Sequence, residues 1–523
     1  MTTPRNILMI AAENGAIPGG KVGGIGDVVR DVPPVLAERG MSVTVFTPSY
    51  GSFADLPGSR RIAVLEVGFR GMSQHVDLYD VPVEGGIPEV RHLVADHPQF
   101  GACGSGRIYC DDPVHSPFAT DATKFAFFCG TVAEALAQSA VTADVLHLHD
   151  WHAALLLVLR RYHPAFRSLR DLYCVYTIHN LALQGVRPLS GNPSSLESWF
   201  PGMTYEPGVV TDPRWNNCVN PMAVGIRLAD AVHTVSPTYA EEIVHPSAVE
   251  TRGYYGGEGL EADLEVARNE RRLFGILNGC EYPTERRPGV PDWPELLKRM
   301  RAQVLHWAGH DTTLAPAQFI AQARLSNLAE RTAPDTILTS VGRITDQKMR
   351  LLNQQDARGR PALEGILEQL GPGGVYLLLG SGDPAYEHFL TTVSSRYDNF
   401  VFLRGYSDEL SRALYGAGDL FLMPSSFEPC GISQMLAMRA GQPCLVHHVG
   451  GLKDTVRDGI NGFAFVGASL EEQAERLVAA CAAALKLRRN EPKRWAAIRD
   501  AAASARFSWQ DSIDQYVDCL YRA

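Results

Sequence analysis

Several features are missing from this 523-residue sequence, and each absence excludes a class of protein. No run approaches about 18 uninterrupted apolar residues, so we expect no membrane span. The apolar run 7–12 is too short for a signal-peptide core. Lys and Arg number 48 against 58 Asp and Glu, and the formal charge of −10 excludes a surface that attracts nucleic acid or anionic lipid as a whole.

Cofactor and metal motifs are missing as well. The ten cysteines show no Cys-x-x-Cys spacing and mostly sit in apolar runs, so we expect buried, reduced thiols in a cytoplasmic protein. His147, His149 and His152 in LHLHDWHA lack the HExxH spacing of zinc sites, and no Cys pair is nearby, so we expect no metal. No GxGxxG is present, which disfavours an NAD enzyme, and no other cofactor is implied.

What is present is an alternation of short apolar runs with helical patterns, which predicts parallel sheets covered by helices on both faces. A helix is expected near 25–38, and residues 281–330 show helical stretches with few strand signals. The expected strands are 6–12, 42–48, 145–148, 174–178 and 231–235 in the first half, and 336–341, 375–380, 400–404, 419–423 and 444–448 in the second.

We therefore predict an α/β protein with two Rossmann-like, doubly wound domains that face each other across a deep cleft. The first domain is expected at 1–270 and the second at 271–505. Residues 506–523 should form a terminal helix, with Ser508 and Asp511 as its capping box, that packs back on the first domain. Ligands of such sheets bind at the carboxyl ends of the strands, so loops after strands carry the chemistry.

Three such loops contain charged residues in informative places. In GGKVGGIGDVV (19–29), glycines around Lys21 let backbone N–H groups approach an anion before a helix; the alternative is a flexible connection with a solvent lysine. In SVGRITDQKMRLL (340–352), Arg343 and Lys348 can neutralise a diphosphate, or form a solvated basic helix face. In PSSFEPCGISQ, Glu428 sits in a proline turn and points into the cleft, or serves only as an N-terminal helix charge.

Two further segments follow expected strands of the first half. HDWHA contains Asp150 and Trp151, and TIHNLALQG contains His179 and Asn180. We expect these residues to line the cleft, to hydrogen-bond a polyhydroxylated ligand, and to stack a sugar face on Trp151.

Together these motifs resemble the family of bacterial glycogen synthases and plant starch synthases. The matching segments occur in the family's order: KVGGIGDV, HDWHA, TIHNLALQG, TVSPTYAEEI, GILNG, GRITDQK, GSGDP and SSFEPCGISQ. The resemblance implies a GT-B fold and transfer of glucose from ADP-glucose, or UDP-glucose, to the non-reducing end of an α-1,4-glucan. It also implies that the anomeric configuration is retained and that no metal takes part.

The resemblance also implies roles for single residues. The groups expected to act on the reacting sugar and its diphosphate are Glu428, His179, Arg343 and Lys348. The groups expected to bind the nucleotide sugar are Lys21, Gly23, Gly24, Asp27, Tyr406, Gly431, Ile432 and Ser433, with Tyr406 stacked on the base. The groups expected on the acceptor side of the cleft are Asp150, Trp151 and Asn180.

Elementary electrostatics agrees with these roles. Breaking the sugar–phosphate bond leaves negative charge on the diphosphate, which Arg343, Lys348 and the helix start near Gly431 can stabilise. Glu428 would orient the sugar and stabilise positive charge rather than act as a nucleophile, so we favour same-face attack by the acceptor hydroxyl. Closure of the two domains is expected to exclude water.

Two alternatives stay open at this point. One is a retaining GT-B transferase with a small, non-glucan acceptor. The other is a catalytically weak glucan-binding homologue. Neither the base of the donor nor the oligomeric state follows from these residues.

Overall fold

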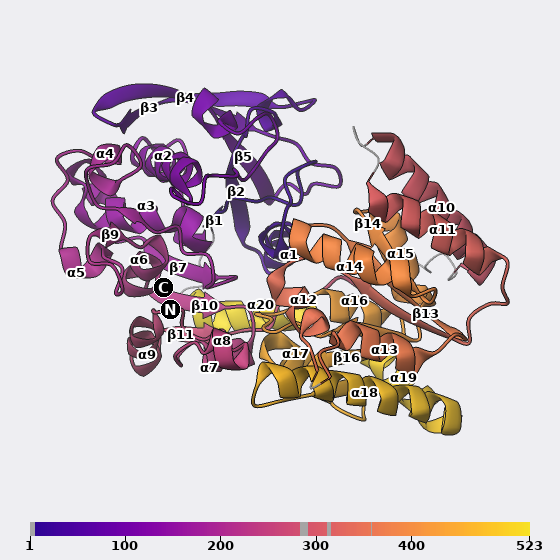
Figure 1. Cartoon of the computed structure of the whole chain (residues 1–523). Helices are drawn as coiled ribbons and strands as arrows, with labels where there is room; N and C mark the ends of the chain where they lie inside the picture. Colours follow the sequence, from indigo (N-terminus) through magenta and orange to yellow (C-terminus); the bar gives the residue numbers. More distant parts are fainter. Residues whose placement is uncertain (1–5, 283–290, 311–314, 357, 523) are drawn as a thin grey trace. The chain divides into compact units, whose positions relative to one another are not determined.

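The structure is a computed structural model that describes residues 6–282, 291–310, 315–356 and 358–522 (Figure 1). The chain forms two compact units. Unit 1 comprises Met1–Ser247, Tyr255–Gly279 and Ser508–Ala523, and unit 2 comprises Ala248–Tyr254 and Cys280–Phe507. The sequence placed the boundary at 270/271, whereas 271–279 belong with unit 1, because β11 (Leu273–Gly275) extends its sheet.

Unit 1 is built on a sheet whose described strands run in the order β11-β10-β7-β6-β1-β2-β5-β4-β3. Every pairing in it is parallel except β3–β4 and β4–β5. The strands besides β11 are β1 (Asn6–Ile10), β2 (Ser42–Pro48), β3 (Arg60–Phe69), β4 (Met72–Asp80), β5 (Val90–Asp96), β6 (Val145–His149), β7 (Tyr173–Ile178) and β10 (Ala231–Thr234). The strands expected from the sequence therefore occur, with ends shifted by a residue or two.

The β3–β4 hairpin was not expected from the sequence. Its chain reversal uses Arg70 and Gly71, both at positive φ (54° and 74°), which is the backbone of a type I′ turn. Residues of β3 alternate between exposed and buried toward its end, as suits an antiparallel edge with one solvated face. Arginine is an uncommon residue at the first position of such a turn, and the signal was missed for that reason.

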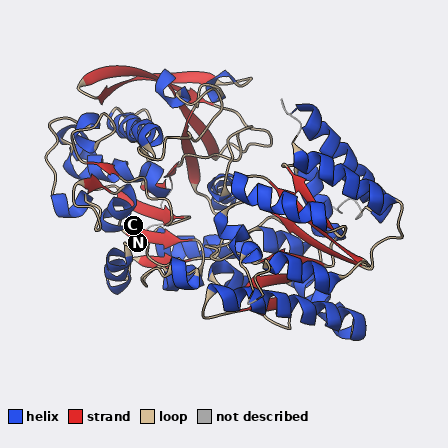
Figure 2. Cartoon of the chain, in the orientation of Figure 1, coloured by secondary structure: helices blue, strands red, loops and turns tan. Residues whose placement is uncertain are grey.

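Helices cover both faces of the strands (Figure 2). In unit 1 they are α1 (Gly24–Glu38), α2 (Ala119–Ala137), α3 (Asp150–Tyr162), α4 (Leu196–Trp199), α5 (Pro207–Val210), α6 (Pro221–Leu228), α7 (Pro237–Glu242), α9 (Glu261–Asn269) and α20 (Trp509–Gln515), with a π-helical turn at Tyr516–Leu520. Shorter elements are the strand pair β8 (Arg187–Pro188) and β9 (Cys218–Val219) and 3-10 turns at Phe53–Asp55, Pro98–Gly101 and Pro164–Leu169.

The C-terminal segment completes the core of unit 1 (yellow in Figure 1). Ser508 caps α20 by accepting from the Asp511 N–H at 3.2 Å. Trp509 packs with α1 and β1 in one buried cluster, and its indole N–H donates to Asp31 at 3.2 Å. Residues 508–523 thus belong to the same compact unit as the first strand.

Unit 2 contains a sheet whose described strands, all parallel, run in the order β14-β13-β12-β15-β16-β17. The strands are β12 (Thr336–Val341), β13 (Gly374–Gly380), β14 (Phe400–Arg404), β15 (Leu420–Met423), β16 (Cys444–His447) and β17 (Gly462–Phe465). The first five agree with the sequence prediction, because each is a nearly continuous apolar run buried on both faces. The edge strand β17 carries a weaker pattern and was not predicted.

The helices of unit 2 include a hairpin within the strand-poor segment 281–330, as the sequence indicated; residues 283–290 and 311–314 of that segment lie outside the described residues. The helices are α8 (Val249–Arg252), α10 (Trp293–His310), α11 (Pro316–Ala329), α12 (Asp346–Asn353), α13 (Ala362–Leu370), α14 (Pro384–Arg396), α15 (Asp408–Ala417), α16 (Ser433–Arg439), α17 (Gly450–Thr455), α18 (Leu470–Asn490) and α19 (Pro492–Ser504). None of the helices described in either unit is long and apolar enough to cross a membrane.

Candidate functional site

The glycine-rich loop of unit 1 joins β1 to α1 and presents Lys21 at the surface. The Lys21 ammonium donates to Asp27 Oδ1 at 2.7 Å, and Arg30 lies 3.2 Å from the same oxygen. Gly23 is the N-cap of α1 and Gly24 its first residue. The sequence-predicted residues of this loop therefore lie together, with Lys21 held against the first turn of the helix.

Glu13 binds the backbone of this loop, a role that the sequence reading missed. Its buried Oε2 accepts from the N–H groups of Val22 (2.8 Å), Gly23 (2.6 Å) and Gly26 (3.3 Å). The expectation that the loop's N–H groups await an external anion is therefore wrong for these three groups, because a side chain of the protein supplies the negative charge. The available signal was the position of Glu13, a carboxylate directly after a buried strand.

Asp150 ties together the loops that follow β6 and β7. It begins α3 with a φ of 53°, an uncommon value for a residue other than glycine. Its Oδ1 accepts from the His179 N–H at 2.7 Å, and burial raises the pKa of the carboxyl to about 7. Asn180, next in the chain, turns its own side chain to accept from the Ala182 N–H at 3.0 Å. The strained residue and its bond fix the position of the His179 backbone.

Trp151 does not fulfil the expected role of a sugar platform. Only 4% of its surface is exposed. Its ring packs against Phe118 and Phe125 at centroid distances of 5.6 Å, and it lies so close to Gly185 that a Cβ there would come within 2.1 Å. The indole is thus a core side chain of unit 1, and no sugar face can stack on it in this arrangement.

A layer of histidines lies at the ends of β6 and β7. His149 Nδ1 is 2.9 Å from His179 Nε2, and the ring of His149 stacks on that of His147 with centroids 4.5 Å apart. Burial, together with neighbouring histidines, holds the pKa of each of these three imidazoles well below the ordinary value. His147 and His149 are fully buried, so only the partly exposed His179 can offer a ring nitrogen to a ligand.

The site residues of unit 2 centre on an ion pair. Lys348, on α12, donates to Glu428 Oε2 at 2.7 Å, and the Ser425 hydroxyl donates to the same oxygen at 3.0 Å. The Glu428 side chain is 8% exposed and that of Lys348 is 18% exposed. Arg343 lies exposed in the loop after β12. The structure thus brings Lys348 and Glu428 into direct contact although 80 positions separate them in the chain.

The turn around Glu428 leads into α16. Gly431 has a φ of +76°, and a Cβ there would come within 2.5 Å of Gln434 Oε1, so only glycine fits without strain. Ile432 is the N-cap of α16 and Ser433 its first residue. Tyr406, in the loop after β14, is 63% exposed, and its hydroxyl donates to Asp408.

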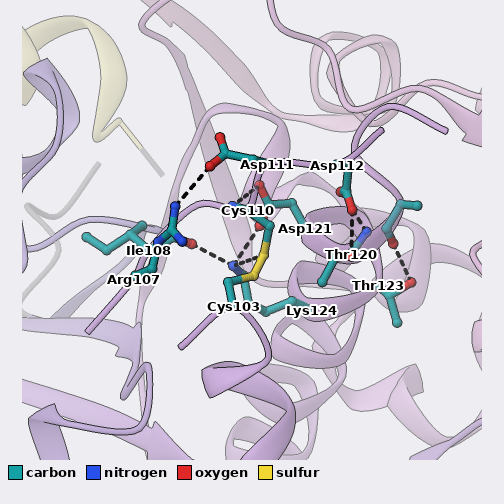
Figure 3. Close-up of a disulfide and its surroundings, with 11 residues drawn as sticks. Cys103, Arg107, Ile108, Cys110, Asp111, Asp112, Thr120, Asp121, Thr123 and Lys124 are labelled. Atoms are coloured by element: carbon teal, nitrogen blue, oxygen red, sulfur yellow. Dashed lines mark hydrogen bonds and ion pairs between the residues drawn. A yellow bond between two sulfur atoms is a disulfide. The ribbon is translucent and has the colours of Figure 1, made fainter. Parts of the chain in front are cut away.

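A disulfide between Cys103 and Cys110 closes a loop of unit 1 (Figure 3). Lys124, whose side chain is fully buried beside it, donates to Asp121 at 2.6 Å and to the Ile108 carbonyl at 2.5 Å. The expectation of reduced thiols is therefore wrong for these two cysteines, whereas the other eight form no disulfide. Their short spacing in a loop rich in turn residues gave no Cys-x-x-Cys signal. Among the described residues they also form, with Asp121, a group close enough to hold a metal ion, but the sulfur atoms are already bonded to each other.

The fold and these residues define a glycosyltransferase. A model of the starch synthase catalytic domain matches residues 6–266, and a model of group 1 glycosyl transferases matches residues 361–486. The chain resembles the catalytic domain of starch synthase IV from Arabidopsis thaliana, a structure with bound ADP and acarbose, with a TM-score of 0.73, 25% identity and 99% of each chain covered. It shares its fold with sucrose-phosphate synthase from Thermosynechococcus elongatus (TM-score 0.54, 18% identity, 99% and 98% covered). Both agree with the predicted GT-B fold.

Full-length relatives define the family within that class. The chain is 33% identical to glycogen synthase from Streptococcus equi subsp. equi over 543 residues, with 99% of both sequences covered. It is also 33% identical to glycogen synthase from Gloeobacter violaceus, with 99% of this chain and 98% of the relative covered. The chain belongs to the glycogen synthase family, and the resemblance seen in its motifs is confirmed.

Proposed function

We propose that this protein transfers glucose from ADP-glucose to the non-reducing end of an α-1,4-glucan and retains the anomeric configuration. Membership of the glycogen synthase family supports the reaction class, and the ADP and acarbose bound to the related starch synthase IV support the two kinds of ligand. The observation that carries the proposal is the buried pairing of Lys348 with Glu428 in unit 2.

In this proposal, the pair supplies a cation and an anion for the two charges that the reaction develops. As the bond from the anomeric carbon to the phosphate oxygen breaks, electrons move to the diphosphate and the sugar becomes positive. Lys348 and Arg343 are assigned to the diphosphate, and Glu428 to the sugar. Preorganised charges of this kind lower a barrier by several kcal/mol, since they need no reorientation during the reaction.

The contacts of Glu428 favour an electrostatic role over nucleophilic attack. Its Oε2 accepts hydrogen bonds from Lys348 and Ser425, which fix the carboxylate beside a cation and make that oxygen a weaker nucleophile. We infer that the acceptor hydroxyl attacks on the face that the diphosphate leaves, and that the departing phosphate oxygen takes the hydroxyl proton. One bond to the anomeric carbon breaks and one forms on the same face, which retains the configuration.

Unit 1 contributes neutral polar groups in this proposal. His179 and Asn180 are assigned to hydroxyl groups of the sugars, and Asp150 positions them through its bond to the His179 backbone. Burial lowers the pKa of His179, so the ring is uncharged at neutral pH. An uncharged imidazole can hydrogen-bond a sugar that is becoming positive without repelling it. Lys21, paired with Asp27, is assigned to the nucleotide sugar.

Four remaining assignments concern the nucleotide. The exposed ring of Tyr406 is assigned to the base, since stacking accepts any aromatic base. Gly431, Ile432 and Ser433 are assigned to the distal phosphate because their backbone forms the start of α16. We also propose a cytoplasmic location, which the eight cysteines outside a disulfide support and the Cys103–Cys110 disulfide opposes.

A radiolabelled transfer assay tests the proposal. The protein is incubated with ADP-glucose or UDP-glucose, each with glycogen, with maltose, or without acceptor. We expect label in glycogen, a higher kcat/KM with ADP-glucose, and α-1,4 linkages that an exo-acting α-glucosidase releases. Label only in small products would indicate a small-acceptor transferase, and glycogen binding without transfer from either donor would indicate a non-catalytic homologue; either result overturns the proposal.

A further inference from the structure

The hydrogen bond between His149 and His179 raises a question of proton position. His149 is the last residue of β6, and His179 follows β7, which pairs with β6 in parallel register. The bond joins His149 Nδ1 to His179 Nε2 over 2.9 Å. Burial keeps the pKa of both rings well below the ordinary value, so each carries a single ring proton at neutral pH.

Two arrangements satisfy this bond. Either His149 donates from Nδ1 to His179 Nε2, or His179 donates from Nε2 to His149 Nδ1. The two differ at the far nitrogen of His149. In the first arrangement His149 Nε2 is an unprotonated acceptor, and in the second it carries a proton.

The surroundings of His149 Nε2 decide between the arrangements. The residue is fully buried, and this nitrogen has no hydrogen-bond partner among the residues that the structure describes. A buried N–H without an acceptor is rarer in proteins than an acceptor with an unused lone pair. The first arrangement is therefore the more stable one, with the His149 proton on Nδ1.

We propose that His149 is a positioning residue that holds His179 in the tautomer protonated at Nδ1. His179 Nε2 is then occupied as an acceptor, and the half-buried ring offers a donor, Nδ1–H, to a sugar hydroxyl. This inference rests on the proposed function only in assigning that hydroxyl to a substrate. The tautomer itself follows from the contacts within unit 1.

The packing beneath His149 keeps its ring from turning over. His147 stacks on it with an interplanar angle of 23°. The two nitrogens of His147 are themselves held, Nδ1 by the Tyr521 hydroxyl at 2.8 Å and Nε2 by the Thr177 hydroxyl at 2.7 Å. A ring so stacked cannot exchange Nδ1 for Nε2 without breaking the layer, so the bond to His179 keeps one polarity.

Nitrogen NMR of the wild-type protein tests the tautomer without reference to activity. With ¹⁵N-labelled histidine, the His179 signals are assigned by their loss in His179→Asn. We expect a protonated, pyrrole-type shift for Nδ1 and an unprotonated, pyridine-type shift for Nε2. The opposite pattern at His179 overturns the inference, whether or not the protein transfers glucose.

Two substitutions at position 149 then test its effect on turnover. In His149→Asn the amide nitrogen lies the same number of bonds from Cα as Nδ1, so it can still donate to His179. In His149→Leu the volume is similar and the donor is lost. We expect kcat for transfer to glycogen within about threefold of wild type for Asn and at least about tenfold lower for Leu, in line with the cost of losing an orienting partner.

The tautomer of His179 seen by NMR should change in the variant that loses turnover and stay the same in the variant that keeps it. His149→Asn is expected to keep the proton of His179 on Nδ1, and His149→Leu to shift it toward Nε2, with both proteins folded as judged by thermal unfolding. Equal kcat in wild type and His149→Leu, or equal losses in both variants, overturns the positioning role. Absence of transfer by the wild type would contradict the proposed function instead and leaves the tautomer result to decide this inference.

Discussion

The two units prepare their site residues in different ways. In unit 1 the groups are bonded mainly to one another: Glu13 to the glycine-rich loop, Asp150 to the His179 backbone, His149 to His179. In unit 2 the central feature is a single ion pair between Lys348 and Glu428, with Arg343 exposed in a nearby loop of the same unit. The difference indicates that unit 1 supplies fixed hydrogen-bonding positions, whereas unit 2 supplies charge. Substitutions in unit 1 should therefore change stability or the positions of groups that bind substrate, and those in unit 2 mainly turnover.

The largest expected effect concerns the charges of unit 2. Arg343→Ala, Lys348→Ala and Glu428→Gln should each lower kcat by about 100- to 1,000-fold, because each removes a charge assigned to the transition state. Circular dichroism should show all three variants folded, although Lys348→Ala leaves the buried Glu428 without its cation and should also lower the midpoint of thermal unfolding. Lys298→Ala is the matched control, since the Lys298 side chain is 81% exposed. Near-normal turnover in any of the three variants would show that unit 2 does not act through these charges.

The second effect is a pH dependence of stability in unit 1. The pKa of Asp150 is raised from 3.8 to about 7 in the folded state, so its ionisation opposes folding as pH rises between those values. Between pH 5 and pH 8 the wild type should lose about 3 kcal/mol of stability from this group, and Asp150→Asn should not.

Urea unfolding of both proteins at the two pH values measures this difference. The stability of Asp150→Asn relative to wild type should rise with pH. If the stability difference between the two proteins is the same at both pH values, the folded-state pKa of Asp150 is close to its ordinary value. Unit 1 would then hold a charged side chain at this position, as unit 2 does at Glu428.

The third effect concerns the disulfide loop of unit 1. The double variant Cys103→Ser with Cys110→Ser should reduce the free energy of unfolding by about 2 kcal/mol, because so short a closed loop limits the entropy of the unfolded chain only modestly. Addition of dithiothreitol to the wild type should give a similar loss, and should not alter the double variant. Cys218→Ser, at a free and partly buried cysteine, is the control. If the reductant does not change the stability of the wild type, the disulfide between Cys103 and Cys110 does not stabilise unit 1.

The smallest effect concerns Glu13. Glu13→Ala leaves three loop N–H groups and the Tyr109 hydroxyl without their acceptor, since Tyr109 donates to Glu13 Oε1 at 2.8 Å. We expect the KM for ADP-glucose to rise about tenfold, which corresponds to about 1.4 kcal/mol, with a smaller change in kcat. Glu13→Gln keeps one acceptor oxygen and should lie close to wild type. An unchanged KM in Glu13→Ala would show that the order of this loop does not govern donor binding.

Local pattern was sufficient for much of the fold. The buried parallel strands of both units are nearly continuous apolar runs, and residues in the loops that follow them, such as Lys21, His179 and Glu428, could be selected from the chain alone. The β3–β4 hairpin could not, because its turn uses arginine at positive φ. Segment 248–254 joins unit 2 through contacts distant in the chain, such as the bond from Arg350 to the Val249 carbonyl, and leaves no local trace.

The candidate site was less predictable than the fold, because roles depend on partners. Nothing near Glu13 in the sequence shows that its carboxylate accepts hydrogen bonds from the N–H groups of Gly23 and Gly26. Trp151 follows a strand end, as a cleft residue should, yet its ring turns inward because Gly185 leaves room for it. The contact of Lys348 with Glu428 was not predicted, because 80 positions separate the two residues in the chain and their motifs gave each a role of its own.

The burial of Tyr521 beneath the histidine layer has a consequence for biosynthesis. A ribosome that makes the chain from its amino end adds about 5 to 20 residues per second, so the strands of unit 1 wait for tens of seconds while all of unit 2 is made. Only then do Trp509 and Tyr521 arrive to close the cluster around β1 and β6. The larger segment of unit 2 is continuous, so unit 2 can complete its own sheet first. Until α20 has been synthesised, the core of unit 1 lacks these side chains, and its apolar surface is accessible to chaperones.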